Sequence, residues 1–144
     1  MLSVRPASAA DSHAIAALIT LLGYAAHADE VNERLLRVLT NTACVLVADL
    51  DGRVVGLATA HAFDAIHLAE QAAWLTTLVV EPDAQRSGVG RALVQAVETW
   101  SREHGSRHVS VLTGAQRADA HAFYERLGFV RTGHRYTKHL TDGS

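Results

Sequence analysis

The chain has 144 residues, of which 49% are hydrophobic and 19% charged, and its formal net charge at pH 7 is −2. This length and composition favour one globular domain over residues 1–144 and exclude a disordered chain. The small net charge does not favour a basic surface for nucleic acid. No apolar run approaches the roughly 18 residues of a membrane span. The first residues, Met1–Pro6, lack a signal-peptide pattern.

Two helices are predicted after a short first strand at residues 2–5. Ser8 and Asp11 have the spacing of a capping box, which marks a helix start, and Gly23 is a typical helix end. Apolar residues recur at helical spacing between these signals. A second amphipathic helix is predicted over residues 29–39.

A β-hairpin is predicted next, with strands at residues 43–48 and 54–60. Asp51 and Gly52 between them are a strong signal for a tight turn. Cys44 lies in the first strand and is the only cysteine, so no internal disulfide can form. We interpret it as a buried structural thiol and expect a reducing, cytoplasmic environment.

The rest of the chain completes a mixed α/β fold. A polar, irregular stretch covers residues 63–71. The elements predicted after it are a strand at 74–80, a helix from Gly88 to His104, a strand at 107–113, a helix at 118–127, and a last strand at 129–140 with a kink at Gly133. The order is β-α-α-β-β-β-α-β-α-β, an antiparallel meander followed by a parallel crossover after Val80.

The segment from Val80 to Ala92 is a strand end, a polar loop with Gly88 and Gly90, and a helix start. Such a helix N-terminus directs unpaired backbone N–H groups and the positive end of the helix dipole to one place, where an anion can bind. The segment is not a Walker loop, because Gly-Lys-Ser/Thr is missing. It is not a dinucleotide loop either, because Leu93 stands where a third glycine is needed.

Two motifs resemble those of the GNAT superfamily of N-acyltransferases, and the resemblance covers essentially the whole chain. The run Val80-x-Pro82-x-x-Gln85-x-x-Gly88-x-Gly90 is similar to the loop that binds the pyrophosphate of acyl-CoA in that family. The run Arg117-x-x-Ala120-x-x-Phe123-Tyr124-Glu125-x-x-Gly128-Phe129 is similar to the family's next motif. Two shorter segments, residues 22–24 and 135–140, resemble small-molecule members such as aminoalkylphosphonate N-acetyltransferases.

The resemblance implies that acetyl-CoA is the cosubstrate and that its acetyl group moves to a primary amine of a small molecule by direct attack in a ternary complex. It also implies that the backbone N–H of Val80 polarises the thioester carbonyl and that Tyr124 is the general acid for the leaving thiolate. The residues implied to bind acetyl-CoA are Leu78, Val79, Val80, Gln85, Arg86, Ser87, Gly88, Val89, Gly90, Arg91 and Tyr124.

The general base is not assigned by the resemblance. Many family members have a carboxylate on the strand before the loop, where this chain has Thr76 and Thr77. No metal site is predicted, because the nine histidines show no spacing typical of ligands. Deprotonation through ordered water is one possibility, and the candidate residues for the base or the acceptor site are Glu81, His61, His67 and Asp64.

The second predicted helix borders the acceptor pocket in this family. Acidic residues such as Asp29 and Glu30 would attract a cationic amine, whereas Arg34 or Arg37 would attract a phosphonate or carboxylate. Two other functions stay open: an acetyltransferase of a protein or peptide amine, and a non-catalytic acyl-CoA sensor. We expect no nucleic-acid and no membrane partner, and the sequence leaves the oligomeric state open, a homodimer included.

Overall fold

A computed structural model describes residues 1–39, 42–111, 118–133 and 135–140 of the chain. The contacts divide the chain into two compact units, Met1–Val111 and Leu112–Ser144. The expectation of a single domain over residues 1–144 therefore stays a prediction.

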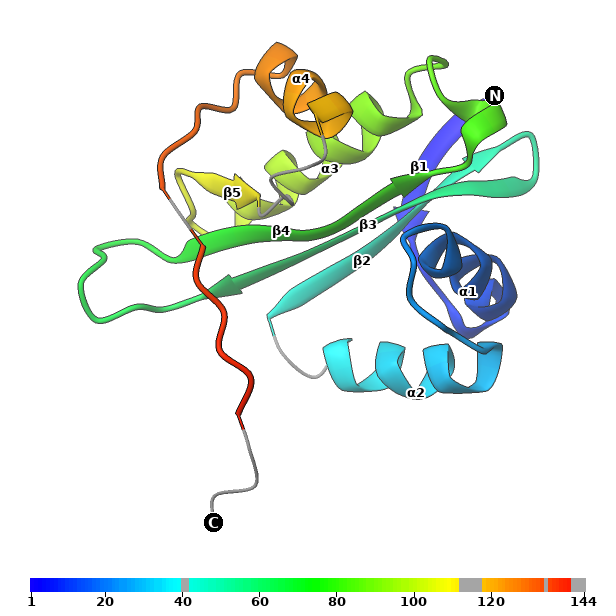
Figure 1. The fold of residues 1–144 in the computed structure, drawn as a ribbon, viewed down its shortest axis with the longest axis horizontal. Coiled ribbons are helices and arrows are strands. Elements are labelled where there is room, and N and C mark those ends of the chain that lie inside the picture. Colours follow the sequence, from blue (N-terminus) through cyan, green and yellow to red (C-terminus); the bar gives the residue numbers. More distant parts are fainter. Residues whose placement is uncertain (40–41, 112–117, 134, 141–144) are drawn as a thin grey trace. The chain divides into compact units, whose positions relative to one another are not determined.

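The first unit is built on a five-stranded mixed sheet (Figure 1). The strands lie in chain order across the sheet. The first four are antiparallel neighbours, and the fifth is parallel to the fourth, as the predicted crossover after Val80 requires. They are β1 (Leu2–Pro6), β2 (Ala43–Leu50), β3 (Arg53–Phe63), β4 (Ala72–Val80) and β5 (Val109–Val111).

Helices of the first unit cover both faces of this sheet (Figure 1). Leu57 and Val79 belong to the apolar core beneath the first two helices. Gly56 faces Val89 and Leu93 of the third helix. Because neighbouring residues of a strand point to opposite faces, the first two helices cover one face and the third covers the other. They are α1 (Ser12–Leu21), α2 (Ala28–Leu39) and α3 (Val89–Glu103), with short 3-10 turns at Ala9–Asp11 and Pro82–Ala84.

The hairpin of β2 and β3 turns at the predicted residues. Asp51 and Gly52 have φ angles of +53° and +89°, the left-handed geometry that a two-residue hairpin turn needs. β3 then continues to Phe63, beyond the predicted end at residue 60. The ring of Phe63 packs edge-on against Trp74 of β4 at 5.3 Å, and such cross-strand aromatic pairs stabilise the extra length of the ladder.

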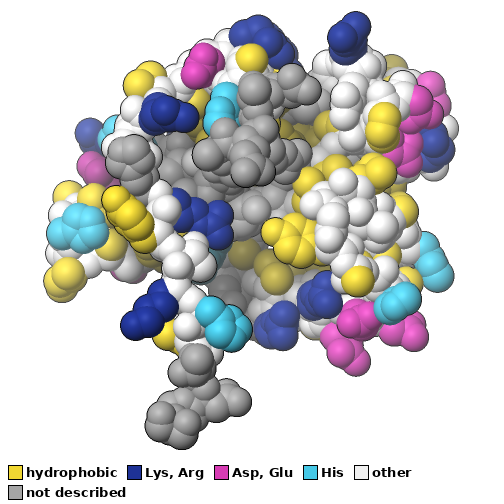
Figure 2. Space-filling model, in the orientation of Figure 1, with side chains coloured by type: hydrophobic (Ala, Val, Ile, Leu, Met, Phe, Trp, Pro, Cys, Tyr) yellow, Lys and Arg dark blue, Asp and Glu magenta, His cyan; other side chains and the backbone are white. Residues whose placement is uncertain are grey.

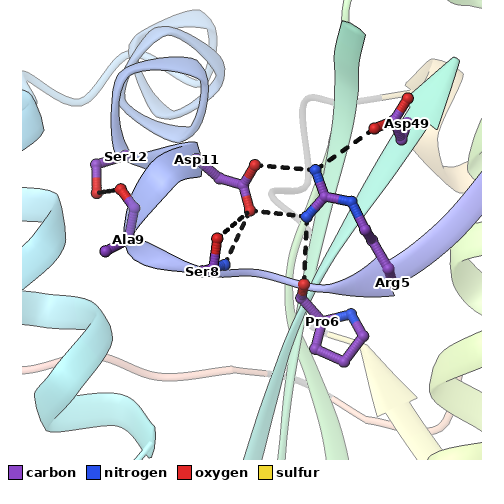
Figure 3. A network of polar contacts seen from close by, with 7 residues as sticks. All are labelled: Arg5, Pro6, Ser8, Ala9, Asp11, Ser12 and Asp49. Atoms are coloured by element: carbon purple, nitrogen blue, oxygen red, sulfur yellow. Dashed lines mark hydrogen bonds and ion pairs between the residues drawn. The ribbon is translucent and has the colours of Figure 1, made fainter. Parts of the chain in front are cut away.

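Arg5 connects the first strand to two other elements (Figure 3). Its guanidinium donates hydrogen bonds to both carboxylate oxygens of Asp11, at 2.9 and 3.0 Å, and to Asp49 of β2 at 3.4 Å. The Asp11 carboxylate also accepts the backbone N–H of Ser8 at 2.8 Å, so the predicted capping box is confirmed. The hydrogen bond from Arg5 holds the pKa of the buried Asp11 carboxyl below its usual range.

The described part of the second unit is α4 (Ala118–Arg126) and the residues after it. Gly128, with φ +95°, ends the helix as predicted. The pattern also predicts a last strand, but the described residues 129–133 and 135–140 contain none. A strand requires backbone hydrogen bonds to a neighbour, and none of these described residues pairs with one.

The other predicted boundaries differ little from the observed ones. Gly23 and Gly105, with φ +97° and +80°, follow the ends of α1 and α3. The strand predicted at 107–113 is observed as β5, and its last two predicted residues lie outside the described part. No helix in the described ranges is long and apolar enough to cross a membrane.

Replacing Asp11 with Asn is expected to destabilise the fold by about 1–3 kcal/mol at pH 7, because Arg5 loses the closer of its two anionic partners. Since the folded pKa of Asp11 is lowered, its contribution is present above the unfolded pKa of about 4 and is lost as the pH falls through the folded value. The difference in unfolding free energy between wild type and Asp11→Asn, measured by urea denaturation, should therefore shrink below pH ~4. The exposed Asp64→Asn is the control, and an equal loss in both variants would contradict the role of the network.

Candidate functional site

A tight loop joins the end of β4 to the start of α3. The backbone N–H of Glu81 donates to the carbonyl of Val55 at 2.8 Å, which ties the first loop residue to β3. Arg86 and Gly88 have φ angles of +70° and +84°, in the left-handed region that is uncommon for residues other than glycine. Gly88 is the N-cap of α3, and a Cβ there would meet nothing within 4 Å, so the space beside it is open.

The loop and the first turn of α3 present free backbone donors. No described acceptor receives a well-formed hydrogen bond from the backbone N–H groups of residues 86–91, and the first helical bond runs from Ala92 to Gly88 at 3.0 Å. Because α3 has 15 residues, the positive end of a full helix dipole adds to these donors. Arg86 and Arg91 are exposed in the same segment. The arrangement suits an anion with several oxygens, such as a diphosphate.

Two side chains brace the loop from within. The amide of Gln85 donates to the carbonyl of Val80 at 3.3 Å, and the hydroxyl of Ser87 donates to the carbonyl of Ala84. These hydrogen bonds hold the loop in shape while the backbone donors stay available to a ligand. Ligand contacts from the side chains of Gln85 and Ser87 stay a prediction.

The edge of β4 that faces away from β3 carries the backbone N–H of Val80. Successive N–H groups of a strand point to opposite edges. Since the N–H of Glu81 bonds to β3, those of Leu78 and Val80 point to the other edge, and that of Val79 points to β3. The described parallel ladder with β5 covers only Ala73–Leu75. The backbone N–H of Val80 therefore points outward from this edge, where it can donate to a ligand.

β4 contains a bulge at Thr76. Pairing with β3 shifts between Thr59↔Thr77 and Ala60↔Leu75, so Thr76 is the extra residue. Its hydroxyl lies 2.7 Å from the hydroxyl of Thr59 and donates to the Thr59 carbonyl at 3.1 Å. A bulge interrupts the alternation of side chains. As a result, Thr76 and Thr77 both line one cavity.

This cavity has a volume of about 380 Å³ and is lined by residues of α1, α2, β2, β3 and β4. Its polar groups are the hydroxyls of three threonines together with His61 on β3 and Arg34 on α2. The cavity thus combines an apolar body with a few polar groups, as binding sites for small molecules do. The apolar lining includes Ile15, Ile19, Val31, Leu35, Val38 and Leu57.

The four candidates for the base are not brought together. His61 lines the cavity. Asp64 and His67 are exposed in the connection between β3 and β4. Glu81 does not line the cavity, and its carboxylate pairs with Arg53 at 3.0 Å. Of the four, His61 alone contributes to the cavity wall.

Tyr124 lies in α4 of the second unit and is partly buried. Its ring packs edge-on against Phe123 at 5.4 Å and Phe129 at 5.5 Å. The backbone N–H of Phe129 also donates to the Tyr124 carbonyl at 3.0 Å. The aromatic pair and the Gly-Phe step of the second motif therefore form one local cluster around the end of α4.

Cys44 is buried in β2, where desolvation raises the pKa of its thiol to about 11. The thiol is protonated at neutral pH and is not a reactive nucleophile, which agrees with a structural role. Within the described ranges, no group of His, Cys, Asp or Glu has the geometry to hold a metal ion.

Sequence reasoning missed the contribution of Thr59 and the bulge that brings Thr76 to it. Thr59 is one polar residue in an apolar strand, and only the strand register places it opposite β4. The bulge had a weak signal in the consecutive polar pair Thr76 and Thr77, which breaks the alternation of an otherwise apolar strand.

A family model described as "Acetyltransferase (GNAT) family" matches residues 13–129. The chain is 34% identical over 135 residues to an aminoglycoside N(6')-acetyltransferase type 1 of Stenotrophomonas maltophilia, covering 90% of this chain and 87% of that protein. It is 32% identical over 90 residues to an aminoalkylphosphonate N-acetyltransferase of Salmonella typhimurium, covering 62% of this chain and 58% of that protein. It is 33% identical over 94 residues to human N-acetyltransferase 8, covering 65% of this chain but spanning only 41% of that protein.

The solved structure of the aminoglycoside N-acetyltransferase AAC(6')-Iy in complex with CoA matches with a TM-score of 0.86 at 19% identity, covering 97% of this chain and 95% of that one. At this identity the likeness shows the fold. The mixed sheet and the flanking helices are thus those of solved acetyltransferases.

Proposed function

The chain belongs to the GNAT family of N-acetyltransferases, and we propose that it moves the acetyl group of acetyl-CoA to a primary amine of a small molecule by direct attack in a ternary complex. The observation that carries the proposal is the row of backbone N–H groups at residues 86–91, at the N-terminus of α3, which have no hydrogen-bond acceptor among the described residues. A diphosphate needs several donors and a positive potential at one place, and this loop offers both.

The proposed chemistry uses one backbone group and one phenol. The amine nitrogen attacks the thioester carbonyl carbon, the C–S bond breaks, and negative charge develops first on the carbonyl oxygen and then on sulfur. The backbone N–H of Val80 is assigned to the oxygen, because it points away from β3 along the edge of β4. The phenol of Tyr124 is assigned to the sulfur, as the acid that protonates the thiolate.

The remaining proton comes from the amine. We assign His61 as its acceptor, directly or through a water molecule, because it is the candidate base that lines the cavity. Thr59, Thr76 and Thr77 add hydroxyls that can orient the amine or that water. Glu81 is assigned a structural role, since Arg53 holds its carboxylate.

A small-molecule acceptor is supported by the relative that matches 90% of this chain, which is named for the 6'-amine of an aminoglycoside. The cavity of about 380 Å³ lies at the lower end of the usual size for small-ligand sites. An acetyltransferase of a protein or peptide amine would favour an open groove over such a cavity.

Substituting Gly88 with Val should reduce CoA affinity by about tenfold or more, because a branched side chain resists the left-handed backbone and blocks the approach to the donors. Gly105→Val is a matched control: Gly105 lies at the other end of α3, with φ +80° and open space around a Cβ. Both variants should lose similar stability, while calorimetry should detect weaker CoA binding in Gly88→Val alone. Equal CoA affinity in the two variants would refute the loop assignment.

Tyr124→Phe should lower kcat by about 100-fold with little change in the affinity for CoA, because the leaving thiolate loses its proton donor. The measurement is thiol release from acetyl-CoA in the presence of a panel of amines. Tyr136→Phe is the control, since Tyr136 is 93% exposed. CoA binding without turnover of any amine by the wild type would instead favour a non-catalytic acyl-CoA sensor.

His61→Gln should lower kcat/KM for the amine by about 100-fold if this imidazole accepts the proton. His67→Gln is its control, because His67 is exposed in the β3–β4 connection and does not line the cavity. The same steady-state assay measures both variants. A similar, small effect of the two substitutions would assign deprotonation to solvent.

A further inference from the structure

The walls of the cavity are unusual for a site that receives a cation. Arg34 is the one fully charged side chain among the described lining residues, and none of those residues is a carboxylate. Moving a polycation into such a place would remove it from water without an opposite charge to pair with, which is costly. We infer that the cavity takes an amine with an apolar body and an anionic group, the anion bound by Arg34.

Arg34 lies on the side of α2 that faces the sheet. It comes one turn after Val31 and one turn before Val38, next to Leu35, and all four residues line the cavity. Among the described residues its guanidinium forms one ion pair, an i,i+4 contact with Glu30 at 3.5 Å on the helix surface. Such a long, half-exposed contact is weak, and the fork of a guanidinium has donors left for a second, bidentate anion.

The charges of α2 are separated along the helix. Asp29 and Glu30 lie in its first turn and Arg37 in its last. Figure 2 shows Lys and Arg side chains over the C-terminal end of α2 and Asp and Glu side chains toward its N-terminal end. The acidic residues of α2 are Asp29, Glu30 and Glu33, and none of them lines the cavity.

The polar groups sit on opposite sides of the cavity and orient the substrate. His61, Thr76 and Thr77 are on the sheet, whereas Arg34 is on α2. An amine directed to the threonines and the imidazole places its anionic group at the guanidinium, with the apolar body against Val31 and Leu35. This substrate class differs from the aminoglycoside for which one relative is named, and the inference rests on the proposed acetyl transfer.

The test compares three acceptors: aminobutylphosphonate, its dimethyl ester, whose phosphonate carries no charge, and kanamycin. Each is measured with the wild type, Arg34→Gln, Arg34→Lys and Arg102→Gln. Arg102→Gln is the control, because it removes one positive charge from the exposed surface of α3. We expect the wild type to prefer the phosphonate, and Arg34→Gln to lower kcat/KM for it by about tenfold while that for the ester changes less than about twofold. Arg34→Lys should restore part of the loss, and Arg102→Gln should resemble the wild type.

Calorimetric binding of aminobutylphosphonate to the CoA-loaded protein is measured in parallel. Three results would overturn the inference and leave the acetyl transfer intact. They are a preference for kanamycin, an equal effect of Arg34→Gln on the phosphonate and the ester, and binding of the phosphonate that does not depend on Arg34. CoA binding without acetylation of any amine would overturn the proposed function, and Arg34-dependent binding of the phosphonate would then still support the inference about the cavity.

Discussion

The contact between α3 and the sheet at Gly56 is the constraint on which the proposed anion site depends. A Cβ at this position would lie 2.9 Å from Cδ1 of Leu93, 2.9 Å from Cγ1 of Val89 and 3.3 Å from Cβ of Ala48. The absence of a side chain lets the first turns of α3 rest directly on β3. Because Val89 is the first residue of α3, this contact sets the position of the helix N-terminus. The backbone donors of the loop thus depend on a glycine of another strand.

β4 serves two sites because its backbone and its side chains point in different directions. Its edge carries the outward N–H groups of Leu78 and Val80, which suit an extended ligand arm. Its face carries Thr76 and Thr77, and the bulge brings both to the cavity. A regular strand would have turned one of the two threonines toward α3. Because of the bulge, two residues of β4 line the cavity, and the acyl donor is expected to lie along the edge of this same strand.

The loop and most elements could be predicted because their signals are local. A helix N-terminus after a strand is readable from a few neighbouring residues, as is the turn at Asp51 and Gly52. The last strand was predicted from the local sequence, which indicates that a segment can pair but not that a partner is available. The role of Thr59 could not be predicted, because the register between β3 and β4 places it beside Thr76. Glu81 was a reasonable candidate base by position, but its pairing with Arg53 depends on where two strands end.

The same distinction separates the two halves of the proposed reaction. The proposed site for the acyl donor uses backbone groups and a helix dipole. Such a site needs little beyond glycines and a helix start, so many sequences can form one. The acceptor cavity is made of side chains from five elements, and its charge is decided by single residues such as Arg34. One turn of α2 separates Glu30 from Arg34, and only the latter lines the cavity. Because residues four apart lie on the same side of a helix, the position along α2, and not its rotation, decides which of the two charges the cavity receives. A single substitution along α2 can thus change the charge of the cavity while the proposed donor site stays the same.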